Sequence, residues 1–139
     1  MAAFQKFNAF VEALAEKVHN LGSDTLTVAL TNTLPVSTST VLANITQISY
    51  TNLQDGTTTG RNLAGVTSAQ TGGTYKLDAA DLVLSATGTV PTFRYLVLFN
   101  NSATNDELIG WYDYGTALDL LNGETLTINW EAAGILTVA

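Results

Sequence analysis

The sequence contains no cysteine and only one histidine among its 139 residues. Without cysteine the chain has neither a disulfide framework nor a thiolate metal site, which agrees with folding in a reducing cytosol. A Ser-His-Asp catalytic site would have to use His19, which we expect in the last turn of a helix, where a cationic ring favours the helix dipole. A structural role is therefore the favoured interpretation of His19.

Positive charge is also scarce, since five Lys and Arg stand against twelve Asp and Glu, giving a net charge of -7. Phosphate contacts need clustered Lys and Arg, so we expect no nucleic-acid partner. The same acidity argues against anionic membrane surfaces, and no apolar run reaches the length of about 18 residues that suggests a membrane span. Lys6 and Glu12 interrupt the apolar N-terminal stretch, so no export signal is predicted.

Hydrophobic residues make up 46% of the chain and charged residues only 12%, about half the usual share of roughly 25%. Disorder driven by charge is therefore excluded, and the length suits a single domain. The polar surface must come from Thr, Ser and Asn, and the β-branched Thr favours strands. We expect residues 1–22 to carry a helix and residues 23–139 to form one antiparallel β domain.

An amphipathic helix is predicted over residues 4–19. Its apolar positions follow helical spacing and form one stripe, which consists of Phe4, Phe7, Phe10, Val11 and Leu14, continued by Val18. Gly22 is expected to supply the left-handed residue that ends the helix. The stripe has two interpretations: it docks on the domain's own sheet, or it packs into a groove of a neighbouring subunit.

After Gly22 the apolar period changes to two, as in a strand with one buried and one wet face: Leu26, Val28 and Leu30 alternate with threonines. Further strands are predicted at 45–50, 63–69, 74–77, 82–86, 93–99, 108–112, 124–130 and 135–138. Turn signals separate them at 55–56, 72–73, 87–88, 100–101 and 122–123. This pattern predicts a mainly β fold, an antiparallel sandwich or jelly-roll-like domain, with exposed loops at 34–40 and 51–60.

Candidate catalytic groups are few. The carboxylate pairs Asp78 with Asp81 and Asp106 with Glu107 would suit calcium at most, and turn formation is the favoured interpretation because no calcium-loop motif surrounds them. There is no G-x-S-x-G elbow and no phosphate-binding glycine loop. We therefore predict that the chain is not an enzyme and uses no metal, cofactor or small-molecule substrate.

The densest aromatic segment is the run of Trp111, Tyr112 and Tyr114 around Asp113. In a strand, Trp111 and Asp113 would face one side and the two tyrosines the other. One face is expected in the core. The other face would also lie in the core, or it would form a protein interface or a platform on which a sugar stacks.

Two parts of the chain have a recognisable wording. Between about residues 75 and 139 it is LVLSATGTVPTFRYLVLFNNSATNDELIGWYDYG, followed by ALDLLNGETLTINWEAAGILTV, and at the start it is MAAFQKFNAFVEALAEKVHNLGSDTLTVALTNTLP. With these segments the chain resembles small virion proteins of tailed bacteriophages. It implies a structural protein of the particle, most similar to a head decoration or cement protein with a β-sandwich body. No catalytic residues come with this family.

The resemblance further implies that the chain binds the lattice of the major capsid protein and copies of itself, commonly as a trimer. It would be made in the host cytoplasm and reside on the capsid surface. Phages also use such β-modules in tails and fibres, so a tail or fibre module that binds a receptor or carbohydrate is the alternative. The candidate contact residues are the helix stripe, Phe4, Phe7, Phe10, Val11 and Leu14, and the aromatic residues Trp111, Tyr112 and Tyr114.

Overall fold

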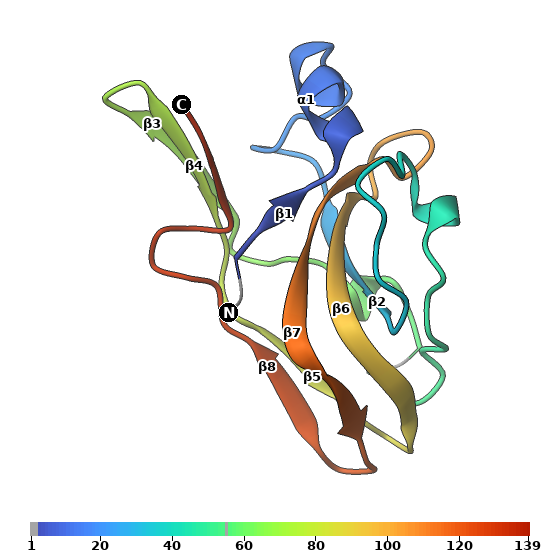
Figure 1. Ribbon diagram of the computed structural model, residues 1–139. Helices are drawn as coiled ribbons and strands as arrows, with labels where there is room; N and C mark the ends of the chain where they lie inside the picture. The colour runs from blue at the N-terminus through green and yellow to red at the C-terminus, as the bar shows by residue number, and fades with distance from the viewer. Residues whose placement is uncertain (1–2, 55) are drawn as a thin grey trace.

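The chain folds into antiparallel strands with one α-helix near the N-terminus, which confirms the predicted fold class (Figure 1). The computed structural model describes residues 3–54 and 56–139. In chain order the elements are β1 (Gln5–Lys6), α1 (Asn8–Ala15), β2 (Leu26–Thr31), the short 3-10 helices η1 (Leu42–Asn44) and η2 (Thr59–Arg61), β3 (Thr67–Thr71), β4 (Thr74–Asp78), β5 (Leu82–Ser85), β6 (Val90–Asn100), β7 (Leu108–Leu120), β8 (Thr125–Ile128) and β9 (Leu136–Val138).

The largest sheet has the order β1-β7-β6-β2 and is antiparallel throughout. Its centre is the long hairpin of β6 and β7, in which Val97 lies opposite Trp111 and Leu96 opposite Tyr112. Neighbouring residues on these strands face opposite sides of the sheet. Each face of the sheet therefore carries its own group of apolar side chains.

Two apolar clusters form on these two sides. The larger one includes Leu96, Leu98 and Tyr112 and extends to the smaller sheets, whereas the second one gathers Phe7, Ala29, Val97, Phe99 and Leu108. The predicted alternation of Trp111 and Tyr112 is confirmed, because Trp111 packs against the second cluster and Tyr112 belongs to the first.

Two smaller sheets complete the fold, one with the order β3-β4-β9 and one made of β5 and β8. The hairpin of β3 and β4 turns at Gly72 and Gly73, whose φ angles of 59° and 86° suit glycine. Every residue of β3 is exposed, and the hairpin projects from the body of the molecule (Figure 1). β9 pairs with β4 and carries the C-terminal residues along the side of this projection, where Val138 lies opposite Tyr75 near the turn.

The predicted helix over residues 4–19 is too long. Gln5 and Lys6 instead pair as a strand with Trp111 and Gly110 of β7, and α1 has only eight residues. Phe4 and Phe7 fit a helical stripe, but long-range pairing with β7 satisfies the backbone at this end. The left-handed residue after the helix is Lys17, with φ 67°, rather than Gly22.

The wet face predicted for the strand at residues 26–31 is absent, since all six residues of β2 are buried. Thr27 donates a hydrogen bond to Asn62 Oδ1 (2.6 Å), so a crossing segment covers this face. The free edge of β2 is covered as well, because Leu63 and Ile48 donate backbone hydrogen bonds to carbonyls of Leu26 and Leu30. Covering the edge in this way removes a template for unwanted strand pairing.

The strand predicted at residues 45–50 does not form. This segment follows η1 as an irregular loop, and the Tyr50 hydroxyl accepts a hydrogen bond from the Leu30 amide (2.9 Å). The side chain of Arg61 lies 3.6 Å from the centre of the Tyr50 ring, which holds the far end of the loop. Asp55, in the predicted turn at 55–56, lies outside the described residues.

Candidate protein interface

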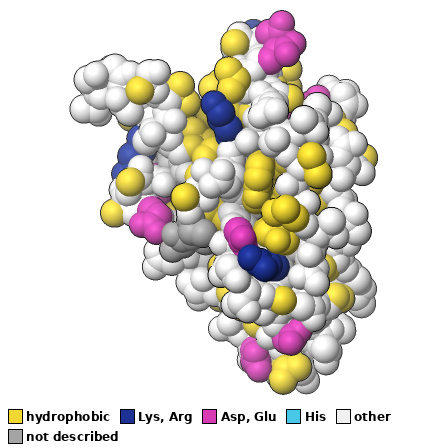
Figure 2. All heavy atoms as spheres, viewed as in Figure 1, with side chains coloured by type: hydrophobic (Ala, Val, Ile, Leu, Met, Phe, Trp, Pro, Cys, Tyr) yellow, Lys and Arg dark blue, Asp and Glu magenta, His cyan; other side chains and the backbone are white. Residues whose placement is uncertain are grey.

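An apolar groove separates α1 and β1 from β9 and the projecting hairpin. It consists of two adjoining hollows of about 440 and 570 Å³, which share Leu14 and Val138. We call it the α1–β9 groove. Figure 2 shows the molecule hollowed between the projection and the body, with hydrophobic side chains in the hollow.

The groove forms where two sheets end. β1 is the outer strand of the large sheet, and β9 is the outer strand of the β3-β4-β9 sheet. Both strands contribute lining residues, among them Lys6 of β1 and Val138 of β9. Unpaired strand edges and apolar side chains together are typical of surfaces that bind other protein.

The border of the α1–β9 groove is positively charged in an acidic protein. Lys6 and Lys17 are exposed lining residues, and no acidic side chain is among the described lining residues. Neither lysine makes an ion pair within the described part of the chain. The other basic residues are engaged elsewhere: Lys76 with Asp78 (3.6 Å), Arg94 with Asp113 (2.8 Å) and Arg61 with Tyr50.

His19 lies in the wall of the groove, beyond the end of α1 and 4% exposed, so its predicted place in the last helical turn is wrong. Asn100 Nδ2 donates to His19 Nδ1 (3.0 Å), while Asn100 Oδ1 accepts the Ser102 amide. This arrangement leaves the proton of the neutral ring on Nε2. Nε2 is buried and has no hydrogen-bond partner among the described residues.

Burial lowers the pKa of His19 below 6.5, against the opposing charges of Glu107 and Asp24. The unfolded chain then binds a proton at a pH where the folded chain does not. The stability contributed by neutral His19 is therefore complete above about pH 6.5 and declines as the pH falls towards the folded pKa.

We accordingly expect the free energy of unfolding to fall between about pH 7 and pH 5, and to fall less steeply in His19→Gln. Urea unfolding at a series of pH values measures both slopes. Comparing slopes separates the titration from any loss of packing against Phe10, whose ring centre lies 5.5 Å from that of His19. Identical slopes would contradict this assignment.

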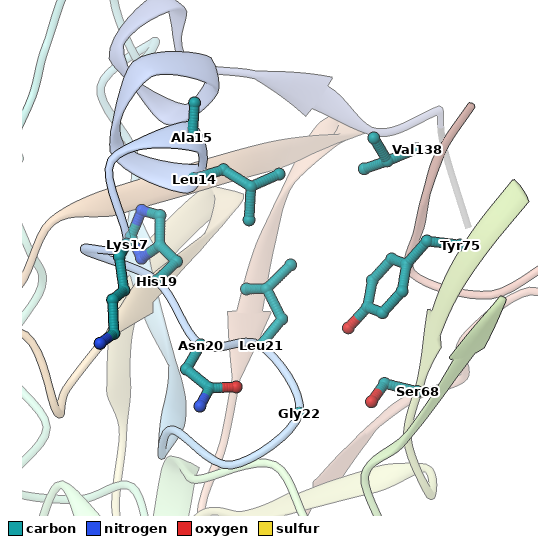
Figure 3. Close-up of a pocket in the computed structure, with 10 residues that line it drawn as sticks. All are labelled: Leu14, Ala15, Lys17, His19, Asn20, Leu21, Gly22, Ser68, Tyr75 and Val138. Atoms are coloured by element: carbon teal, nitrogen blue, oxygen red, sulfur yellow. The ribbon is translucent and has the colours of Figure 1, made fainter.

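Tyr75 provides a second unsatisfied polar atom in the same wall. Its hydroxyl is buried without a hydrogen-bond partner in the described structure. Figure 3 shows this hydroxyl directed into the pocket between Leu21 and Ser68, with Val138 above it. The pocket is therefore lined largely by apolar surface, and the two polar atoms without partners are buried in its wall.

The predicted contact residues separate into two groups. Phe7, Phe10 and Tyr112 are buried in the chain's own clusters, at 0%, 5% and 3% exposure, so they are not available to a partner in this structure. The first two show that the helix stripe docks on its own domain. Val11, at 52% exposure, and the half-buried Phe4 and Leu14 line the α1–β9 groove.

The aromatic segment of β7 does not form an open sugar-stacking platform. Trp111 packs on Phe7 with ring centres 4.7 Å apart, and the Tyr112 hydroxyl donates to the carbonyl of Ile135 (2.9 Å). Tyr114 is half-buried against the first cluster, and burial raises its pKa to about 12. These side chains hold the sheet to its two clusters.

The carboxylate pairs have local roles. Asp78 accepts the amide of Ala79 (2.9 Å) and pairs with Lys76. Asp106 adopts φ 53° in the turn before β7, and burial, followed by the charge of Glu107, raises its pKa. Among residues 3–54 and 56–139, no three potential metal ligands of the His or carboxylate type lie together. No helix in these ranges has the length and hydropathy to cross a membrane.

Sequence reasoning missed Lys17, Tyr75 and Val138 as groove residues. Tyr75 and Val138 are neighbours because β4 pairs with β9, where they lie directly opposite each other. The alternating pattern predicted both strands, but no local signal indicated that they pair.

Comparison of the chain with protein-family models, with curated proteins and with solved structures gives no match. Neither a family nor a function follows from these comparisons.

Proposed function

We propose that this protein is a non-catalytic structural subunit of a bacteriophage virion, a decoration or cement protein that binds the major capsid protein lattice and copies of itself. The α1–β9 groove is the observation that carries the proposal. It combines an apolar lining, two outer strands and exposed lysines at one site. Such a surface favours protein association over turnover of a small substrate.

The rest of the fold supports an assembly role. The β3–β4 hairpin projects from the body, with every residue of β3 exposed, and so offers a second contact surface. Exposed apolar side chains also occur on the loop at 34–36, where Leu34 and Val36 are 61% and 60% exposed. The resemblance of residues 75–139 to phage virion proteins gives these surfaces a partner, the capsid lattice. The subunit folds in the host cytoplasm and then resides on the capsid.

Fractionation of purified particles tests this function. Heads and tails are separated on a density gradient and probed with an antibody against the protein. We expect the protein in the head fraction, retained after a salt wash that removes loosely bound protein. Its presence in tails alone would replace the decoration role with a tail role, and its absence from both fractions would contradict a virion protein.

A further inference from the structure

The α1–β9 groove attracts negative charge. Lys17 stands at its border, and the buried Nε2–H of His19 and hydroxyl of Tyr75 lack acceptors among the described residues. Both buried atoms are out of reach of solvent, so the charge that faces an occupant of the groove is that of Lys17 at its border. With no acidic side chain in the described lining, the field of the groove favours a carboxylate beside an apolar side chain.

The turn between β7 and β8 carries this combination. Leu121 is 53% exposed there, and Asp119 and Glu124, both exposed, lie on either side of it in sequence. Figure 2 shows acidic and hydrophobic side chains together at the end of the molecule where Figure 1 places this turn. We call these residues the β7–β8 tip.

We propose that the β7–β8 tip of one copy docks in the α1–β9 groove of the next copy. In this arrangement, Leu121 enters the apolar part between Leu14 and Val138, and Glu124 meets Lys17 at the border. The size is suitable, because the hollow at Lys17 has about 440 Å³, and a cavity of about 150 Å³ already accommodates benzene. The inference adds to the proposed function by assigning an occupant to the groove.

The two surfaces lie apart on the molecule, so the contact joins unlike surfaces. The groove lies beside α1, whereas the β7–β8 tip lies at the opposite end of the molecule (Figure 1). Repeated from copy to copy, such a contact is head to tail, and head-to-tail contacts close into rings or continue as filaments.

Charge reversal in purified protein tests the contact without any capsid. Sedimentation velocity at low salt should show oligomers whose population rises with concentration and falls as salt screens the exposed charges. Lys17→Glu and Glu124→Lys, each alone, place like charges together, and each should weaken association about tenfold or more, equivalent to about 1.4 kcal/mol. Asp81→Lys reverses an exposed charge outside both surfaces and should leave association unchanged.

An equimolar mixture of Lys17→Glu and Glu124→Lys should restore association, because each variant then meets an opposite charge on its neighbour. A general effect of net charge would not produce this restoration. Wild-type protein that stays monomeric up to millimolar concentration, or variants that the mixture fails to rescue, would overturn the proposal. If either result were obtained while the protein was found on heads, the docking between copies would be rejected and the proposed decoration function would be retained.

Discussion

Replacing Phe7 with alanine is expected to lower the free energy of unfolding by about 3–5 kcal/mol. Phe7 has no exposed surface and fills the second cluster, where it packs on Trp111. Its amide also donates to the Ile109 carbonyl (3.2 Å), so the side chain is held where the segment before α1 joins the sheet. Removing the ring leaves a cavity next to β7.

Urea unfolding followed by tryptophan fluorescence measures this loss. Val11→Ala, on the adjoining helix α1, is the matched control, because Val11 is 52% exposed and its truncation should change the stability by no more than about 0.5 kcal/mol. A Phe7→Ala protein with wild-type stability that no longer enters particles would contradict docking on its own domain. Phe7 would then be an anchor between subunits.

The second large effect is expected for Gly110→Ala. A Cβ atom at Gly110 would come within 2.2 Å of the Phe4 ring and 2.6 Å of the Gln5 carbonyl oxygen. The ring can move, but the carbonyl belongs to β1, which pairs with Gly110 through Lys6. We expect β1 to separate from β7, with a loss of about 1–3 kcal/mol.

Hydrogen exchange identifies the separation. Amides of residues 4–7 should exchange much faster in Gly110→Ala, while those of β6 should stay protected. Thr116→Ala, at an exposed position on the same strand, controls for substitution in β7. Unchanged exchange at residues 4–7 would show that β1 tolerates a side chain at position 110.

The central parts of β6 and β7 were predictable as strands because their pattern is local, whereas the extension of β7 from residue 113 to Leu120 was not predicted. The apolar residues from Phe93 to Phe99 and the aromatic run at Trp111 have a strand pattern, and the alternation correctly divided Trp111 from Tyr112. The glycine pair at 72–73 similarly predicted the turn between β3 and β4. Each of these features depends on neighbours in the sequence.

The errors occurred where distant segments decide the structure. Phe4 and Phe7 have helical spacing, yet residues 5–6 pair with β7 in the large sheet. This close approach is possible because Gly110 has no side chain. The threonines of β2 indicate a wet face, but Asn62 covers Thr27 and the segment at Thr46 covers Thr31. None of these contacts has a signal in the local sequence.

The candidate interface was predictable only in part. The helix stripe included Leu14 and Val11, which line the α1–β9 groove, and also Phe7 and Phe10, which belong to the core. Periodicity identifies an apolar face and does not divide it between core and partner. The other wall of the groove exists because β9 pairs with β4, which is a property of the topology.

Reconstruction of intact heads tests the proposed role as a capsid decoration subunit. We expect density for a β body with one helix on the outer surface of the capsid lattice, repeated with the lattice symmetry. A head map that resolves every capsomer and shows no such density would contradict it.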